Sequence, residues 1–245
     1  MNAPSSIAPA EVARFAALAR DWWDPAGAFA PLHALNPARL GVVRDACLGH
    51  FAADPAARAP FAGRRLLDIG CGGGLVAEPM ARLGFSVTGL DAADEAVGVA
   101  RAHAEGLGLA IDYRQGAVEG LVAAGEPPFD VVLALEVVEH VNAPADFIAD
   151  AARLVAPGGL MILSTLNRTV KSLALGKIAA EYLLRWAPAG THDWKKFITP
   201  PELAALLDAA GLTPASPVGL GYDPLAGRWK RSADCGVNFM MAAAK

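Results

Sequence analysis

The sequence predicts an α/β protein built around a mostly parallel sheet, and three observations carry this prediction. Short apolar segments alternate with amphipathic ones from residue 64 onward, which is typical of right-handed strand–helix–strand units. A glycine-rich segment joins the first apolar segment to the amphipathic segment after it. The chain has 245 residues, enough for one large domain with a substantial core.

Two helices are expected before the sheet begins, and together they suggest an N-terminal helical cap over residues 1–60. "PAEVARFAALARDWW" places Val12, Phe15, Leu18 and Trp22 on one stripe of a helix. A loop punctuated by prolines follows, and a second helix is expected from about Asn36. Residues 61–245 form the remaining domain, with an insertion at about 168–198 that interrupts the alternation.

The order of the later elements follows from the same pattern. Strands are predicted at "RRLLDIG", "FSVTGLD", "AIDYRQG", "FDVVLAL" and "LMILSTLN". Helices are predicted at "GGLVAEPMARLG", "ADEAVGVARAHAEGLG", "PADFIADAARLVAPGG" and "TPPELAALLDAAGL". The tail from Gly219 onward is expected to add the final antiparallel strands.

Composition excludes several classes of protein. A formal net charge of -4 gives no overall basic footprint, so nucleic acid is not an expected partner. The three cysteines are odd in number and widely spaced, which matches neither a disulfide framework nor a zinc module. No export signal and no long uninterrupted apolar segment is visible. These features predict a protein of the reducing cytoplasm.

The segment "LLDIGCGGGL" predicts a nucleoside-cofactor site. Glycines between a strand and a helix let the backbone turn tightly beside a ligand, and the next strand ends at Asp91, which suits a ribose diol. The alternative is a turn with a helix-capping aspartate. A dinucleotide loop would carry glycine where Leu75 stands, and Asp68 would repel a pyrophosphate. A cationic cofactor is therefore favoured.

The pattern D-x-G-x-G-x-G from Asp68 to Gly74 resembles motif I of class I S-adenosylmethionine-dependent methyltransferases. "FDVVLALEVVEHV" and "LVAPGGLMILSTLN" resemble later motifs of that family in the expected order. One departure is Gly116, where many relatives carry an acid, so adenine would rest on backbone and apolar groups near Ala117 and Val118.

Three flanking segments resemble the ubiquinone-biosynthesis O-methyltransferases, the UbiG family: "WWDPAGAFAPLHALNPARL", "GTHDWKKF" and "GVNFMMAAAK". This resemblance implies a seven-stranded, doubly wound, Rossmann-like fold and S-adenosyl-L-methionine as cofactor. It also implies methylation of ring hydroxyls of 2-polyprenyl-6-hydroxyphenol and 3-demethylubiquinol intermediates. Carried over by position, it implies Arg39, Gly70, Asp91 and Leu135 as cofactor-binding residues. Asp68 of motif I and Gly72 of the glycine-rich segment are expected to bind the cofactor with them.

Arg39 also has a physical role available, because a guanidinium can grip the carboxylate at the methionine end of the cofactor. A surface ion pair on a helix is the alternative. Two neighbours are weaker candidates. His33 either lines the substrate site or belongs to a loop, and Asn36 either contributes to the site or caps the second helix.

"LEVVEHV" supplies the candidate catalytic residues His140 and Glu136. A phenol needs a base or a cation to become nucleophilic at neutral pH. His140 could take the proton, with Glu136 or Glu139 orienting it. Alternatively Glu136, Glu139 and His140 could ligate a divalent cation such as Mg²⁺, a dependence that the family resemblance also implies. A third interpretation makes Glu139 a cap of the next helix.

The insertion predicts an amphipathic lid. Leu175, Ile178, Ala179, Tyr182, Leu183 and Trp186 recur at helical spacing in "KSLALGKIAAEYLLRWAP". Core packing is the usual explanation of such a stripe. Because a polyprenyl substrate resides in a bilayer, a lid docking on the inner face of the membrane is the alternative. His192, Asp193 and Lys196 then either face the substrate or anchor the lid. Other enzymes of ubiquinone biosynthesis are further candidate partners.

Three rival functions remain open. One is a class I methyltransferase acting on another small phenol or amine. The second is a nucleotide-binding oxidoreductase, which Leu75 and Asp68 disfavour. The third is a scaffold protein that binds the cofactor without catalysis, which the polar edge of "LEVVEHV" disfavours.

Overall fold

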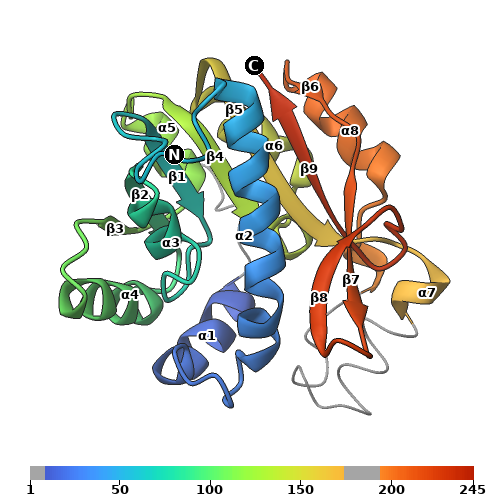
Figure 1. Ribbon diagram of the computed structural model, residues 1–245, viewed down its shortest axis with the longest axis horizontal. Helices are drawn as coiled ribbons and strands as arrows, with labels where there is room; N and C mark the ends of the chain where they lie inside the picture. The colour runs from blue at the N-terminus through green and yellow to red at the C-terminus, as the bar shows by residue number, and fades with distance from the viewer. Residues whose placement is uncertain (1–8, 174–193) are drawn as a thin grey trace.

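The computed structural model describes residues 9–173 and 194–245 (Figure 1). The predicted lid helix, with Leu175, Ile178, Ala179, Tyr182, Leu183 and Trp186, lies outside these residues, as do His192 and Asp193. Lys196 is described and exposed in a short 3-10 helix, Trp194–Lys196.

One twisted sheet organises the described chain, in the order β3-β2-β1-β4-β5-β9-β7-β8, with β6 pairing to β9. The strands β1 to β5 pair in parallel, and β6 to β9 join antiparallel. Their bounds are β1 Arg65–Ile69, β2 Ser86–Asp91, β3 Asp112–Gln115, β4 Phe129–Leu135, β5 Val155–Leu166, β6 Thr213–Pro214, β7 Val218–Asp223, β8 Arg228–Ser232 and β9 Asn238–Ala244. The prediction of seven strands is wrong, because the described part of the chain forms a sheet of nine.

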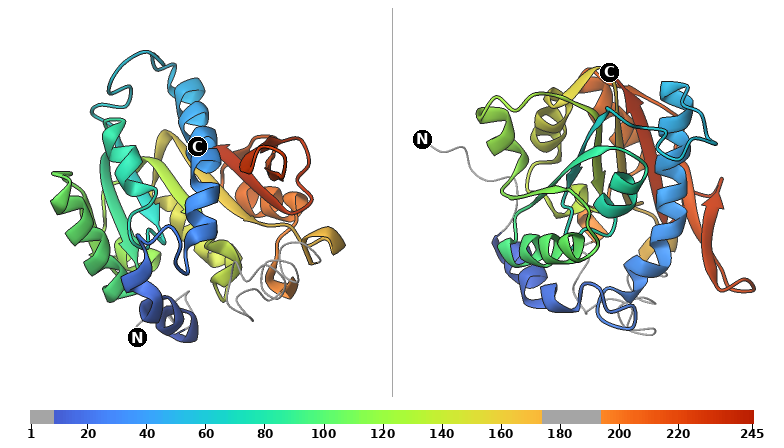
Figure 2. Two further views of the ribbon diagram at one scale, coloured as in Figure 1. Left: turned by 60° about the horizontal axis from the view of Figure 1, so that its bottom comes forward. Right: turned by 60° about the vertical axis from the view of Figure 1, so that its left-hand side comes forward.

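Helices cover both faces of the sheet (Figures 1 and 2). The helix α2 crosses one face beside α3 and α4, and α5, α6 and α8 cover the other. The helical bounds are α1 Pro9–Leu18, α2 Ala30–Phe51, α3 Ala77–Arg82, α4 Asp94–Gly106, α5 Val118–Ala123, α6 Pro144–Arg153, α7 Val170–Ser172 and α8 Pro200–Ala209, with 3-10 helices at Ala19–Asp21 and Val138–His140. The doubly wound α/β fold is therefore confirmed.

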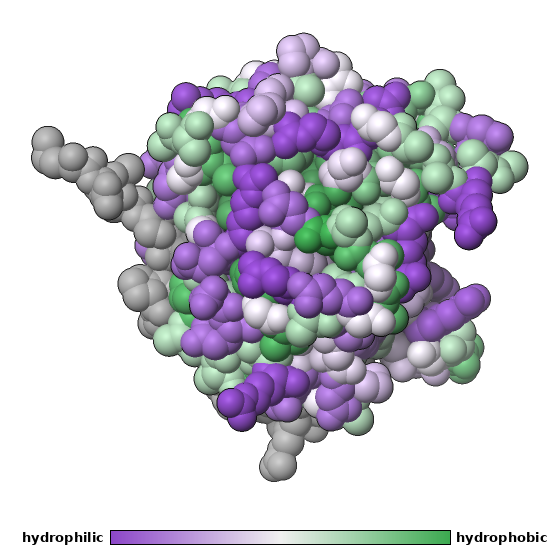
Figure 3. Space-filling model, turned by 90° about the vertical axis from the view of Figure 1, so that its left-hand side faces the viewer, coloured by the Kyte–Doolittle hydropathy of each residue, from purple (hydrophilic) through white to green (hydrophobic). Residues whose placement is uncertain are grey.

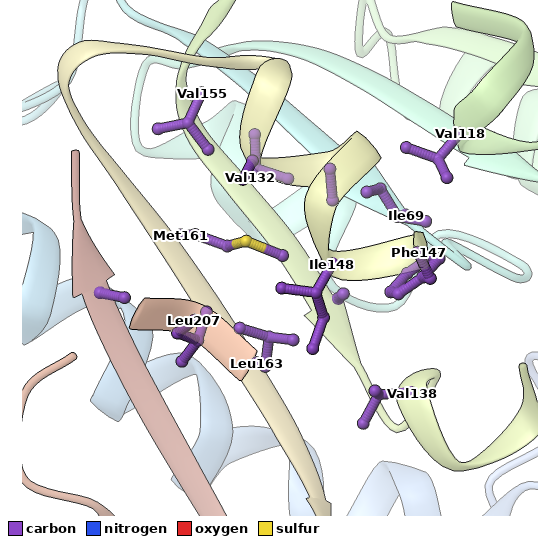
Figure 4. Packing of buried hydrophobic residues seen from close by; sticks show 14 of the residues in the cluster. Ile69, Val118, Val132, Val138, Phe147, Ile148, Val155, Met161, Leu163 and Leu207 are labelled. Atoms are coloured by element: carbon purple, nitrogen blue, oxygen red, sulfur yellow. The ribbon is translucent and has the colours of Figure 1, made fainter. Parts of the chain in front are cut away.

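The hydrophobic core consists of two layers, one on each side of the sheet. Adjacent residues of β1 point to opposite faces, so Leu66 packs in the layer of α2 and Leu67 in the layer of α6. Figure 4 shows the second layer, where Phe147 and Ile148 of α6 meet side chains of β1, β4 and β5. Burial on both faces explains why the central strands β4 and β5 read as largely apolar runs.

Three local differences from the predicted elements have clear causes. The helix α2 begins at Ala30 rather than near Asn36, because Pro31 lies in its first turn, where a missing N–H costs nothing. The Pro-Gly-Gly segment lies early in β5, where the pairing of β5 with β4 shifts its register, and it does not close the preceding helix. The helix α5 was not predicted, since its 6 residues are too few to show a period.

Both edges of the sheet differ from its apolar centre. The face at the β3 end mixes hydrophilic and hydrophobic residues over β3 and α4 (Figure 3). At the other end, β7 and β8 form a hairpin that projects from the body of the protein (Figure 2). No helix of the described residues has both the length and the apolar character needed to cross a bilayer.

Candidate cofactor and methyl-transfer site

The glycine loop lies between β1 and α3, at the carboxyl edge of the parallel strands. Gly70, Gly72 and Gly74 have φ values of 72°, 52° and 93°, in the left-handed region that glycine tolerates best. The amides of Gly70 and Cys71 both donate to the carbonyl of Leu90, at 2.7 and 3.1 Å. These bonds fold the loop back over the end of β2.

Asp91 ends β2 and joins the loops that follow β1, β2 and β3. Its carboxylate accepts the amides of Gly72 and Ala93, at 2.8 and 2.9 Å. Its carbonyl accepts the amide of Gly116 at 2.8 Å. Burial raises the pKa of Asp91, and the backbone donors oppose that rise. Each carboxylate oxygen keeps a lone pair available for a ligand hydroxyl.

Asp68 is buried near the carboxyl end of β1, and its Oδ2 has no hydrogen-bond partner among the described residues. Burial raises the pKa of this carboxyl to about 7, while the charge of Arg39 opposes the rise and that of Asp91 adds to it. A buried carboxylate oxygen without a donor is unfavourable. It is therefore a ready partner for a cationic ligand.

Arg39 reaches the same place from α2 and is only 4% exposed, so the surface ion pair considered above is wrong. Its Nη2 donates to Oδ1 of Asn36 at 3.1 Å, and its Nε has no acceptor among the described residues. Burial lowers the pKa of Arg39, whereas the nearby carboxylates of Glu136 and Asp68 raise it. The buried guanidinium thus lies near one acid on β1, Asp68, and one just after β4, Glu136.

The residues before Arg39 on α2 correct two of the weaker predictions. Asn36 does not cap the helix. It is buried within α2 and its Nδ2 donates to the carbonyl of Leu75 at 2.8 Å. His33 is not in a loop either, because it lies within α2. Nε2 of its ring is 2.9 Å from the carbonyl oxygen of Trp22. One face of α2 therefore holds the glycine loop and the N-terminal segment together.

"LEVVEHV" begins at the end of β4, where Leu135 is buried beside β5. Glu136 has a φ of 58°, unusual for a residue with a side chain. Its amide donates to the carbonyl and the Oγ of Ser164, at 3.1 and 3.0 Å. Its Oε1 accepts from Ser164 Oγ at 2.7 Å and from Asn238 Nδ2 at 2.9 Å. Such strain is common at functional sites.

The side chain of Glu139 lies next to that of Glu136. It is 3% exposed, and its Oε2 accepts the hydroxyl of Thr165 at 2.9 Å. Burial, together with the charge of Glu136, raises the pKa of Glu139 well above its ordinary value. The two carboxyl groups therefore favour a state in which Glu139 holds a proton.

His140 ends the 3-10 helix Val138–His140, and its amide donates to the carbonyl of Val137 at 2.9 Å. Glu136, Glu139 and His140 do not share the face of one α-helix, because Glu136 precedes the helical turn in a left-handed conformation. No group of three His, Cys, Asp or Glu side chains in the described residues could hold a metal ion. The predicted three-residue metal site is not formed.

Several side chains at the site were not singled out in the sequence. Ser164, Thr165 and Asn238 hold the two glutamates from β5 and β9. The signal for the first two was a pair of hydroxyl residues inside an otherwise apolar strand. Trp23 donates from Nε1 to the carbonyl of Gly73 at 3.0 Å. The Trp-Trp-Asp segment carried the family resemblance but gave no indication of this contact.

Comparison with known proteins places this geometry in a family. A family model described as a methyltransferase domain matches residues 46–216. The ubiquinone biosynthesis O-methyltransferase of Caulobacter sp. (strain K31) is 57% identical over 245 residues, covering 100% of this chain and 97% of that protein. The chain belongs to the ubiquinone biosynthesis O-methyltransferases. The enzyme of that name from Azorhizobium caulinodans is 54% identical over 241 residues, covering 98% of this chain and 95% of that protein.

Solved structures agree with the fold. A methyltransferase from Thermotoga maritima, described as a possible histamine N-methyltransferase, has a TM-score of 0.63 at 16% identity and covers 96% of this chain and 99% of its own. Magnesium protoporphyrin IX methyltransferase from Synechocystis PCC 6803, with bound SAH, has a TM-score of 0.58 at 20% identity. The match covers 84% of this chain and 83% of that one. The predictions of a class I methyltransferase fold, of the family and of S-adenosyl-L-methionine as cofactor are confirmed.

Proposed function

We propose that this protein transfers a methyl group from S-adenosyl-L-methionine to a ring hydroxyl of a polyprenyl phenol or quinol. The observation that carries the proposal is a pair of buried polar atoms beside the glycine loop, Asp68 Oδ2 and Arg39 Nε, neither of which has a partner in residues 9–173 and 194–245. The methionine end of the cofactor bears an ammonium and a carboxylate. The ammonium complements the carboxyl of Asp68, and the carboxylate complements the guanidinium of Arg39. Membership of the ubiquinone biosynthesis O-methyltransferases supports the choice of acceptor.

The remaining contacts to the cofactor follow from the loops at this edge. Asp91 is available to accept hydrogen bonds from the ribose hydroxyls. Gly70 and Gly72 provide backbone that a ligand can approach closely. Leu135 would lie beside the cofactor at the end of β4, and Ala117 with Val118 would provide the wall for adenine.

The cofactor supplies an activated methyl group, so the protein must align the acceptor and remove its proton. We assign His140 as the general base. The phenolic proton passes to the imidazole, the oxygen forms a bond to the methyl carbon, and the bond from that carbon to sulfur breaks. Glu136 would act as a positioning residue, because its αL backbone and its bonds to Ser164 and Asn238 fix the turn that leads to His140.

Proton transfer to His140 is favoured over activation by a metal. The Glu136 oxygen Oε1 already accepts two hydrogen bonds, and Glu139 favours its protonated form. Because burial and the charge of Glu136 favour protonated Glu139, Glu139 would have to lose its proton before it could bind a divalent cation. Since the described residues also include no group of three such side chains that could hold a metal ion, the mechanism includes no step through a cation.

The test is methyl transfer to short-chain analogues of the two substrates, a 2-prenyl-6-hydroxyphenol and a demethylubiquinol, each with and without EDTA. We expect both analogues to be methylated at oxygen, with EDTA changing the rate less than about twofold. Loss of activity in EDTA that Mg²⁺ restores would contradict the proton mechanism. Methylation of simple phenols or amines in preference to both analogues would contradict the proposed acceptor.

We also propose that the protein contacts the membrane that holds its substrate, through the β7–β8 hairpin. Leu225 at the hairpin tip is 100% exposed. On an acidic protein, Arg228, Lys230 and Arg231 of β8 outnumber the single acid of the hairpin, Asp223. An apolar tip flanked by basic residues suits an anionic bilayer surface. Contact with other enzymes of the pathway stays a prediction, as does a place on the inner face of the membrane.

Flotation with vesicles rich in phosphatidylglycerol tests this contact. We expect Leu225→Asp to bind roughly tenfold more weakly than the wild type, since it replaces an apolar side chain at the hairpin tip by a charge that the anionic surface repels. Leu107→Asp is the matched control, because Leu107 is also exposed but lies at the end of α4. Equal binding of all three proteins would contradict a role of the hairpin.

A further inference from the structure

The side chain of Trp22 lies directly on the glycine loop. A Cβ atom added to Gly72 would lie 1.9 Å from Cζ2 of Trp22, and one added to Gly73 would lie 2.2 Å from its Cδ1. Real side chains do not approach so closely, so any residue other than glycine would displace the indole. The need for glycine at 72 and 73 thus arises in part from Trp22.

The N-terminal segment holds Trp22 in this position by several contacts. The carbonyl of Trp22 bonds to His33 on α2 at 2.9 Å. The indole packs on Phe29, with ring centroids 3.9 Å apart, and its cluster includes Leu75 and Ala93 from the loops after β1 and β2. The indole therefore bridges the glycine loop and the loop that begins at Asp91.

The neighbouring Trp23 anchors the same segment. Its Nε1 donates to the carbonyl of Gly73 at 3.0 Å, and its ring stacks on His103 with centroids 3.6 Å apart and planes 9° apart. His103 in turn is 2.6 Å from the carboxylate of Glu78 on α3. The polar group of Trp23 is thus satisfied by the protein.

The polar group of Trp22 is not satisfied in this way. Its Nε1 is buried and has no acceptor among the described residues. Trp194, like Trp23, has one, the carbonyl of Thr169 at 3.0 Å. Buried indole N–H groups normally find a partner. A buried donor without an acceptor beside a cofactor loop indicates that a ligand oxygen completes the bond.

We propose that Trp22 is a cofactor-binding residue whose Nε1–H donates to a ribose oxygen of S-adenosyl-L-methionine while its ring walls the pocket from water. The inference rests on the proposed cofactor site around Asp91. The ribose is the chosen acceptor because Gly72, which lies under the indole, also donates its amide to Asp91 at 2.8 Å. The carboxylate of Asp91 would accept a hydrogen bond from one ribose hydroxyl. The Nε1–H of Trp22 would donate a hydrogen bond to the oxygen of a ribose hydroxyl.

Calorimetry with S-adenosylhomocysteine tests the inference without turnover. We expect Trp22→Phe, which keeps an aromatic ring but loses the N–H, to raise the dissociation constant roughly tenfold, as expected for a lost hydrogen bond. Trp229→Phe on β8 is the matched control and should bind as the wild type does. Thermal unfolding and intrinsic fluorescence of each variant report whether the fold is retained.

A second arm varies the ligand instead of the protein. Analogues of S-adenosylhomocysteine that lack the 2′- or the 3′-hydroxyl remove one candidate acceptor at a time. We expect one of them to bind Trp22→Phe and wild type equally, because its acceptor for Nε1–H is gone. Binding of S-adenosylhomocysteine to Trp22→Phe within about twofold of wild type would overturn the inference, as would full affinity of wild type for both analogues. Failure of the wild type to bind S-adenosylhomocysteine would overturn the proposed cofactor site itself.

Discussion

Replacement of Arg39 by methionine is expected to destabilise the protein by about 3–5 kcal/mol at pH 8 and to remove measurable binding of S-adenosylhomocysteine. Methionine has a similar length, so the change removes the charge with little loss of volume. It leaves the buried carboxyl of Asp68, and that of Glu136 nearby, without their cation. For a protein of this size the loss corresponds to roughly 6–20 °C in Tm.

The loss of stability in Arg39→Met should depend on pH in a defined direction. Burial already raises the folded-state pKa of Asp68 to about 7, whereas an unfolded aspartate titrates near about 3.9. The folded state therefore binds the proton more tightly, and stability falls as pH rises from about 4 through about 7. The charge of Arg39 opposes this rise in the pKa of Asp68. Without Arg39 the pKa of Asp68 is higher still, so the stability of the variant continues to fall at higher pH. The difference in Tm between variant and wild type should grow from pH 5 to pH 8.

Scanning fluorimetry across that pH range measures the effect, and Arg231→Met is the matched control. Arg231 pairs with Asp45 at 2.7 Å on the surface, with side chains 44% and 50% exposed. Exposed pairs contribute at most about 1 kcal/mol. Equal Tm losses for the two variants, or a deficit for Arg39→Met that shrinks as pH rises, would contradict the view that Arg39 stabilises buried acids.

The parallel half of the fold was predictable from sequence because its signals are local. The strands β1, β2, β4 and β5 are buried on both faces and read as apolar runs, and the glycine loop marks where the first helix begins. The antiparallel half gave weaker signals. The strand β6 has only 2 residues, and β8 is a largely exposed edge rich in charge. Short or polar strands lack the alternation from which strands are recognised.

The start of α2 shows how tertiary packing outweighs a local signal. Pro31 favoured a loop that lasts until about Asn36, yet Pro31 lies within α2, as does Pro37. Val42, Val43 and Cys47 further along the helix are buried against the sheet. Burial of this face stabilises the whole helix and offsets the missing amide of Pro37. The loop assignment of His33 and the capping role of Asn36 were wrong for the same reason.

Candidate site residues could be found where a motif carries them, and their partners could not. Asp68, Gly70, Gly72, Asp91 and Leu135 lie at the carboxyl edge of the sheet, as the strand–loop–helix pattern predicts. Ser164 and Asn238, which bind Glu136, lie 28 and 102 residues away in the chain. Only the pairing of β5 with β4 and β9 brings them together.

The largest expected effect on catalysis comes from His140. Replacement of His140 by alanine should lower kcat by about 10²–10⁴, the range for loss of a general base. The proposed step requires a phenol to lose its proton, and a phenol has a pKa near about 10. Without a base, the reaction depends on the small fraction of acceptor already ionised. The rate of the variant should therefore rise nearly tenfold per pH unit between about pH 7 and pH 9.

This pH dependence separates a general base from a residue that only shapes the turn after β4. A loss of structure would lower kcat by the same factor at every pH and would weaken cofactor binding, whereas loss of the base should leave the affinity for S-adenosylhomocysteine unchanged. His50→Ala is the matched control, because His50 is exposed and lies in the last turn of α2, far along the helix from Arg39. Its ring Nε2 is 2.9 Å from the carbonyl oxygen of Gly158. A parallel pH profile for His140→Ala and wild type would remove His140 from the chemistry and leave the acceptor proton to another group.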